Sequence, residues 1–183
     1  VMQAAGGPAR QLTSTPGRDS EPSWSPNGRD ILFRSRPQSA WIVSASGGAP
    51  RLVAEGFGPD PVWSPDGLWV LLRRNGALYR VPSAGGDATP LTPTPPSPRP
   101  GSTVRFSRDG RHLYYVESGP TADQNIWRLS FADGKISPLT RLAGRRGVLN
   151  YYFAADARFL YFTWREDDGD IWVMDAANLG EGD

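Results

Sequence analysis

The chain has 183 residues, with 20 Lys and Arg against 19 Asp and Glu, so its formal net charge is +1. This balance argues against a nucleic-acid-binding protein, which carries a clear excess of basic side chains. There is no cysteine, and His112 is the one histidine. The chain alone therefore supplies no disulfide, no thiolate metal site, no cysteine nucleophile and no cluster of histidine ligands.

The sequence has no apolar run of the roughly 20 residues that a membrane-spanning helix needs, so no membrane insertion is expected. Residues 1–7 lack the basic and apolar regions of a signal peptide, and the localisation is unknown from the chain itself. The 21 Gly and 18 Pro predict many turns.

A short motif recurs along the chain and sets its organisation. Trp24-Ser25-Pro26-Asn27-Gly28 returns as Trp63-Ser64-Pro65-Asp66-Gly67, then as Phe106-Ser107-Arg108-Asp109-Gly110, and a decayed fourth copy keeps Phe153 and Asp156. The aromatic residues that open the copies are 39, 43 and 47 positions apart. This spacing is typical of a four-stranded propeller blade of roughly 40–50 residues. We interpret the motif residues as structural, because Ser and Asp bond their own backbone in turns and Gly permits the turn conformation.

The same elements follow each motif in chain order. An apolar run comes first, at 31–33, 70–72, 113–116 and 159–162. A polar loop and a second β-prone run follow, the latter at 41–43, 78–81, 126–129 and 171–173. A turn of small residues and a last short strand complete the unit, and no run is long enough for a helix.

The pattern predicts an all-β chain, a β-propeller of about four four-stranded blades, either as a closed four-bladed ring or as an arc of a larger propeller. We expect one domain, 1–183, with blades at about 22–55, 61–92, 103–140 and 151–177. The alternative is an ordinary antiparallel sandwich, which four copies in phase argue against.

The two ends of the chain complement each other. Residues 1–13 match the end of a third strand, a Gly-Gly turn at 6–7 and a fourth strand, whereas the last repeat stops after its third strand. The spare outer strand of 1–13 is therefore expected to pair with the last blade and close the ring, unless the chain is an arc. Two copies could also close an eight-bladed ring as a homodimer.

The Trp-Ser-Pro-Asp-Gly motif, with its apolar strand, Ile-Trp strand and Gly-Gly turn, resembles the TolB-like (WD-like) propeller repeat. It is also similar to the propellers of the prolyl oligopeptidase and dipeptidyl peptidase family and of tricorn-type proteases. The resemblance to TolB-like proteins implies a bacterial, periplasmic or extracellular protein that acts by protein–protein contacts.

Our prediction is accordingly a non-catalytic scaffold without cofactor, catalytic residue or metal, since the sequence has no Gly-x-Ser-x-Gly nucleophile elbow. The alternative is a gating or sensor propeller segment of a larger enzyme, either an oligopeptidase-family peptidase or a kinase. A lyase or glycan-binding propeller is a weaker third hypothesis.

The candidate binding residues are arginines that the repeat places in loops on one face. They are Arg34, Arg36, Arg73, Arg74, Arg145, Arg146 and Arg165. Acidic residues, among them Asp19, Glu21 and Asp60, share this face. We expect a mixed-charge surface for a protein or peptide partner, with no nucleic acid; ordinary solubilising charge explains the pattern equally well.

Three further features have plainer explanations than a site. The acidic run 166–170 has the oxygens for Ca²⁺ but not the alternating spacing of a calcium loop, so a solvated hairpin loop is favoured. His112, alone, is interpreted as a structural or surface residue. The proline-rich segment 93–100 is expected to be a stiff loop between blades rather than a recruitment motif.

Overall fold

A computed structural model describes residues 1–14, 17–35, 37–91, 104–118, 124–142, 147–156, 158–165 and 170–175. The chain forms two compact units, Val1–Leu91 and Thr92–Asp183, which are treated separately below. The described part of the chain is all-β: it contains strands and turns, and no helix in it could cross a membrane.

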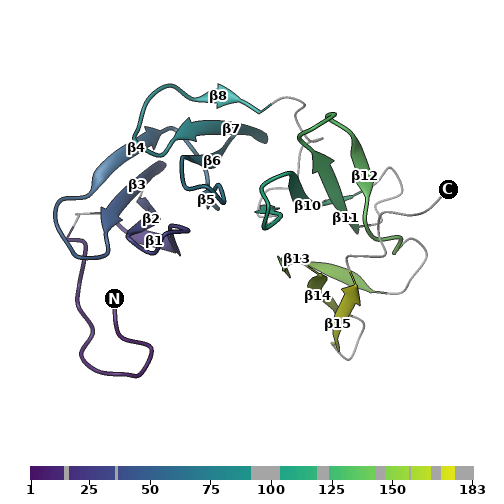
Figure 1. Ribbon diagram of the computed structural model, residues 1–183, viewed down its shortest axis with the longest axis horizontal. Coiled ribbons are helices and arrows are strands. Elements are labelled where there is room, and N and C mark those ends of the chain that lie inside the picture. Colours follow the sequence, from purple (N-terminus) through teal and green to yellow (C-terminus); the bar gives the residue numbers. More distant parts are fainter. Residues whose placement is uncertain are drawn as a thin grey trace. The chain divides into compact units, whose positions relative to one another are not determined.

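The first unit holds two antiparallel four-stranded sheets (Figure 1). In each, the strands lie in chain order. The first sheet consists of β1 (Asp19–Trp24), β2 (Asp30–Ser35), β3 (Ser39–Ser44) and β4 (Arg51–Glu55). The second consists of β5 (Val62–Trp63), β6 (Trp69–Arg74), β7 (Ala77–Pro82) and β8 (Thr89–Pro90).

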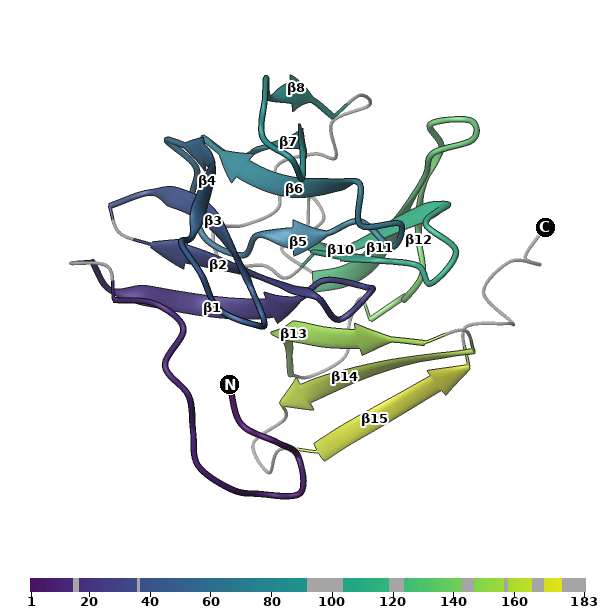
Figure 2. The same cartoon turned by 60° about the vertical axis from the view of Figure 1, so that its left-hand side comes forward.

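The second unit holds the third and fourth repeats. The third sheet consists of β9 (Val104–Phe106), β10 (His112–Ser118), β11 (Gln124–Ser130) and β12 (Ile136–Pro138). The fourth sheet has three strands, β13 (Val148–Ala155), β14 (Phe159–Arg165) and β15 (Asp170–Asp175), with β15 at its edge (Figure 2). The all-β prediction with four repeats is confirmed.

Each motif builds the tight turn between the first two strands of its sheet. The serine hydroxyl donates to the side chain two residues later, over 2.8 Å in the first copy, 2.5 Å in the second and 2.6 Å in the third. It also accepts the backbone N–H five residues later, at 2.9, 3.1 and 2.9 Å. The motif glycines have φ near +70°, a conformation that favours glycine (Gly28, Gly67, Gly110). The motif thereby fixes the first hairpin of every repeat.

Consecutive sheets within a unit pack face to face in one order. We call the face of a sheet that bears the motif aromatic its front face, and the opposite face its back face. In the first unit, Trp63, Val70 and Leu72 on the second sheet's front face share a buried cluster with Leu32 and Ile42 on the first sheet's back face. Burial of each such side chain contributes about 1.5–3 kcal/mol.

The second unit repeats this arrangement with different residues. Phe153, Leu160 and Phe162 on the front face of the fourth sheet pack against Val116 and Ile126 on the back face of the third. Because successive side chains of a strand alternate between the two faces, one run such as 31–33 serves both neighbours of its sheet. Front-on-back packing is therefore the rule in both units.

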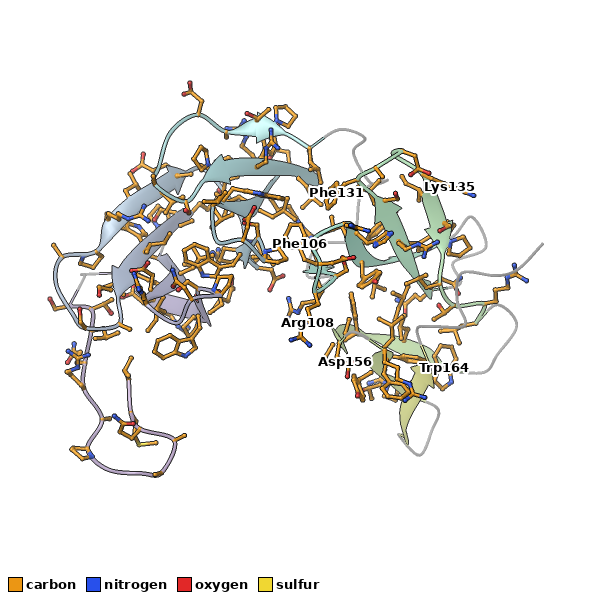
Figure 3. All side chains as sticks on the ribbon, in the orientation of Figure 1. Phe106, Arg108, Phe131, Lys135, Asp156 and Trp164 are labelled. Carbon is orange, nitrogen blue, oxygen red and sulfur yellow. The ribbon has the colours of Figure 1, made fainter. Side chains whose placement is uncertain are left out.

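The motif turns of neighbouring sheets also meet. A Cβ added to Gly67 would lie 3.6 Å from the Pro26 ring. In the second unit Arg108 replaces that proline, and it lies close to Asp156 of the next motif (Figure 3). Hydrogen bonds from the N–H groups of Arg158 and Phe159 are the main cause that lowers the pKa of Asp156, and the Arg108 charge adds to it. The departure from the motif thus coincides with an ionic contact.

Residues 1–14 form no strand, but they carry the hydrogen bonds of a strand hairpin. The backbones of Val1 and Arg10 are joined by two hydrogen bonds of 2.7 Å. The same nine-residue offset joins Ile42 to Arg51 in the first sheet and Arg80 to Thr89 in the second. Between them, the Gly-Gly turn 6–7 has φ values of 94° and 120°, as the equivalent turn at 47–48 has 99° and 115°. The expected turn is therefore present, without the regular outer strand.

Candidate functional site

The loop face of the first unit is the end of its two sheets where the β2–β3, β4–β5 and β6–β7 links lie. These links are tied together by backbone hydrogen bonds. Gly56 donates to Gln38 over 2.7 Å, and Gly58 donates to the Arg73 carbonyl over 2.7 Å. The first unit thus presents its link residues on a connected framework, the usual setting for binding residues.

Four charged residues occupy repeat-equivalent positions on this face. Glu21 and Asp60 lie three residues before the motif tryptophan of their repeats, and Arg34 and Arg73 lie ten residues after it. Each repeat of the first unit therefore contributes one acid from the chain entering its first strand and one arginine from the end of its second.

Glu21 links the two repeats through both carboxylate oxygens. Its Oε1 lies 3.5 Å from Arg34 Nη1, and its Oε2 accepts the backbone N–H of Asp60 over 2.7 Å. A register shift in β1 between Ser20 and Ser23 turns Glu21 toward this partner. The carboxylate thereby bridges an arginine of the first sheet and the link that enters the second.

The backbone of both acids is strained. Glu21 has φ of 55° and Asp60 has φ of 61°, in the left-handed region that residues with a Cβ seldom adopt. Such a conformation costs about 1–3 kcal/mol and persists where surrounding contacts impose it. Here the Glu21 carboxylate supplies such a contact for Asp60.

Arg73 is the most buried charged side chain of the face, with 6% of its surface exposed. Burial lowers the pKa of its guanidinium, and the nearby Asp60 carboxylate opposes this shift. Since arginine remains protonated in proteins, Arg73 is a fixed positive charge set beneath the surface.

Arg74 adds an exposed cation beside aromatic rings. Its guanidinium carbon lies 4.9 Å from the centre of the Phe57 ring and 4.5 Å from that of Tyr79. The two rings meet edge to face, with centres 5.6 Å apart. A guanidinium held this way is oriented while its outer N–H groups stay available for a carboxylate.

The structure brings together three of the seven predicted arginines: Arg34, Arg73 and Arg74. Arg165 ends β14 in the second unit, where it is exposed. Arg36, Arg145 and Arg146 lie outside the described residues. So do the proline-rich segment 93–100 and the side chains of the acidic run 166–170.

Sequence reasoning placed Glu21 and Asp60 on this face only as charges that offset the arginines. It missed the link between them and the aromatic support of Arg74. The available signal was the acid–proline pair, Glu21-Pro22 and Asp60-Pro61, at the same distance before two motifs.

The chemistry of the face is that of recognition. It offers guanidinium groups, carboxylates and ring edges, and the chain's one histidine lies in the other unit, where the His112 ring stacks on Tyr114 with centres 6.5 Å apart. Within the described ranges, no group of three or more His, Cys, Asp or Glu side chains lies together to hold a metal ion.

Comparison with known proteins shows likeness of structure only. No known family is matched by the sequence, and no curated protein matches it. Among solved structures, TolB from Acinetobacter baumannii aligns with a TM-score of 0.78 and 17% identity, over 97% of this chain and 46% of that one. A putative TolB from Agrobacterium tumefaciens aligns with a TM-score of 0.67 and 25% identity, over 89% of this chain and 60% of that one.

An enzyme is among the similar structures as well. A puromycin-hydrolysing peptidase from Mycobacterium tuberculosis aligns with a TM-score of 0.71 and 16% identity, over 93% of this chain and 29% of that one. This chain therefore spans about half the length of the TolB chains and less than a third of the peptidase. At the level of the fold, the resemblance seen in the repeat is confirmed: the four repeats are β-propeller blades similar to those of TolB and of the oligopeptidase-type enzymes.

Proposed function

We propose that the chain is a non-catalytic β-propeller scaffold whose loop face binds a protein or peptide partner through acidic side chains. The observation that carries this proposal is the arrangement of Arg34, Arg73 and Arg74 around only two carboxylates, with Arg74 exposed over two aromatic rings. Arginine beside aromatic groups is enriched where proteins bind proteins.

The buried part of the face prepares the exposed part. Glu21 neutralises Arg34 and holds the link before β5, and Asp60 lies near Arg73. Arg74 has aromatic neighbours instead of an ion-pair partner at its guanidinium among the described contacts. It is the arginine of this group best placed to contact an incoming carboxylate.

The test uses a fluorescein-labelled hexapeptide of alternating glutamate and leucine, with the glutamine–leucine peptide as its uncharged control. Fluorescence anisotropy should show binding of the acidic peptide that weakens with added salt. Arg74→Gln should weaken it about tenfold, which corresponds to about 1.4 kcal/mol. Arg80→Gln is the matched control, because Arg80 is an exposed arginine of β7 that lies over Trp69 and not on the loop face. Equal affinity of Arg74→Gln and the unaltered chain would contradict the assignment.

A homodimer, a single domain built of all four blades, and a bacterial periplasmic or extracellular location belong to this proposal as finer parts. A second copy is one protein partner, and it would use a surface other than the loop face. Location is testable by fractionation of cells that express the full coding sequence.

The second candidate is a gating or sensor segment of a larger enzyme. The alignment with the puromycin-hydrolysing peptidase favours it, because that enzyme accommodates the whole repeat pattern in under a third of its length. A hydrolase or kinase domain encoded beside this segment would favour the second candidate, and peptide binding by the isolated chain would favour the first.

A further inference from the structure

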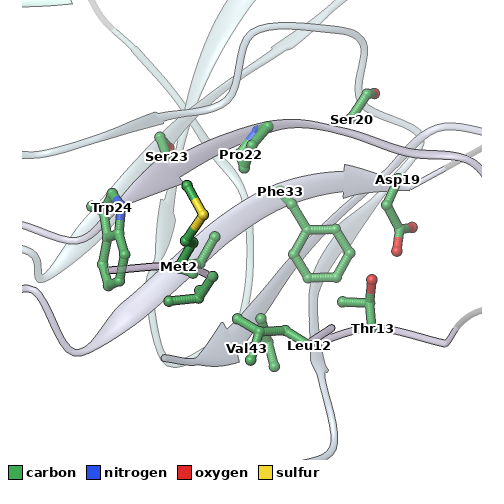
Figure 4. A pocket seen from close by; sticks show the side chains of 12 residues that line it. Met2, Leu12, Thr13, Asp19, Ser20, Pro22, Ser23, Trp24, Phe33 and Val43 are labelled. Atoms are coloured by element: carbon green, nitrogen blue, oxygen red, sulfur yellow. The ribbon is translucent and has the colours of Figure 1, made fainter. Parts of the chain in front are cut away.

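An apolar groove lies on the front face of the first sheet. It has a volume of about 430 Å³, and Trp24, Ile31, Phe33 and Val43 form its floor (Figure 4). Trp24 is 53% exposed, whereas the equivalent Trp63 of the second sheet is 9% exposed. The two tryptophans open the same motif, so the difference comes from what covers them.

The rule of packing says what kind of surface the groove fits. In both units a front face is covered by the back face of another sheet. The first sheet's front face instead meets the chain's first residues: Leu12 packs against its apolar cluster, and Val1 and Met2 line the groove while 40% and 59% exposed.

The N-terminal hairpin occupies part of the place of a preceding blade. Leu12 follows Arg10 by two residues, as Val53 follows Arg51, and Val53 belongs to the cluster that covers the second sheet's front face. Arg10 also donates to the carbonyls of Ala45 and Ser46 in the β3–β4 turn. The outer strand of such a blade is therefore supplied by 9–12, and the groove is the part that its other strands would fill.

The fourth sheet has the complementary gap. It consists of three strands, and its edge strand β15 carries no fourth strand within the described residues. Tyr161 and its register partner Val173 hold the back-face positions that Leu32 and Ile42 hold in the first sheet. Tyr161 is 37% exposed, whereas Leu32 is fully buried under the next sheet.

We propose that the groove is the docking site for the fourth sheet of a second copy of this chain. In this arrangement β15 takes residues 9–12 of the other copy as its fourth strand, in place of Val1 and Met2, and Tyr161 enters the groove against Ile31 and Phe33. By the register of the first sheet, Val173 pairs with Arg10, as Ile42 pairs with Arg51. The interface continues the front-on-back packing already present inside each unit.

A second copy suits this site for two reasons. The contact joins two different faces, so each copy both donates and receives a sheet, and two copies close through two equivalent contacts. Two copies also supply eight blades, within the roughly four to eight of propellers, and approximate the length of the TolB chain of which one copy spans 46%.

The test is the mass in solution, by light scattering coupled to gel filtration. The unaltered chain should have twice the mass of 19.9 kDa. Trp24→Lys and Tyr161→Lys should each have the mass of one copy at the same concentration. Leu68→Lys is the matched control, because Leu68 is a 70% exposed apolar residue away from the groove, and its variant should keep the double mass.

Mixing the two variants separates loss of the contact from loss of the fold. A mixed pair has one contact between two unaltered faces and one that combines both changes, so the mixture should regain a double-mass species that neither variant forms alone. A single-copy mass for the unaltered chain, no gain on mixing, or dissociation of Leu68→Lys would each overturn the proposal. Binding of the acidic peptide to the loop face should survive Trp24→Lys, so the proposal here and the proposed function can fail separately.

Discussion

Removal of the Glu21 carboxylate should destabilise the first unit more than a surface charge normally does. The charge-assisted hydrogen bond to the Asp60 N–H, 2.7 Å long, is worth about 1.5–3 kcal/mol. The contact with Arg34, whose side chain is 20% exposed, adds about 0.5 kcal/mol because solvent screens it in part. Glu21→Ala should therefore lower the free energy of unfolding by about 2–3 kcal/mol.

Two further variants separate the carboxylate from the strain at position 21. Glu21→Gly loses the same contacts but relieves the positive φ of 55°, so it should be about 1 kcal/mol more stable than Glu21→Ala. Glu21→Gln keeps an oxygen that can accept the Asp60 N–H and should fall between Glu21→Ala and the unaltered chain.

Urea unfolding followed by tryptophan fluorescence measures these differences, since Trp63 belongs to the same unit and donates its indole N–H to the Ser23 carbonyl over 3.2 Å. Glu55→Ala, an exposed acid at the end of β4, is the control and should change stability by less than about 0.5 kcal/mol. A loss below 0.5 kcal/mol for Glu21→Ala, or a less stable Glu21→Gly, would refute the reasoning.

Three other outcomes follow from the structure. Gly147→Ala should lower the melting temperature sharply, because the added Cβ would lie 2.5 Å from Trp164 Nε1 at a φ of 128°. Trp63→Ala should cost about 3–5 kcal/mol in chemical unfolding, since this large side chain is 9% exposed within the buried cluster. The lowered pKa of Asp156 means that its charged form favours the fold above the ordinary carboxyl pKa, and that this contribution is lost as the pH falls through the lowered value. Asp156→Asn should remove this acid sensitivity and bring the raised pKa of Tyr161 back toward 10, as read from phenolate absorbance against Tyr161→Phe.

The repeat could be predicted from sequence because its signals are local. Serine, Asp or Asn and glycine at fixed spacing determine a turn by hydrogen bonds within six residues, and short alternating apolar runs determine strands. The same reasoning assigned the motif aromatics to packing between blades. That holds for Trp63 and Phe153, which are 9% and 5% exposed, and is wrong for Trp24 at 53%. A residue's own repeat says which face it occupies, but not whether a neighbour covers that face.

The candidate site was predictable only in part for a similar reason. Loop positions of Arg34, Arg73 and Arg74 follow from the repeat. The bridge from Glu21 to the Asp60 backbone depends on a register shift in β1 and on two left-handed backbone conformations, which no local pattern of glycine marks. Such contacts join residues 39 positions apart and arise only when two sheets pack.

The motif turns also decide how the chain ages chemically. Asn27 precedes Gly28 in an exposed turn, and Asn-Gly sequences are the ones most prone to deamidation. The second and third copies already carry aspartate there, with the same serine and N–H partners, so conversion of Asn27 to aspartate leaves a turn that the chain builds elsewhere. Isoaspartate, the other product, adds a carbon to the main chain and cannot keep the serine hydroxyl and the N–H of Arg29 on one side-chain oxygen. Storage damage at this turn should therefore come from the isomer alone.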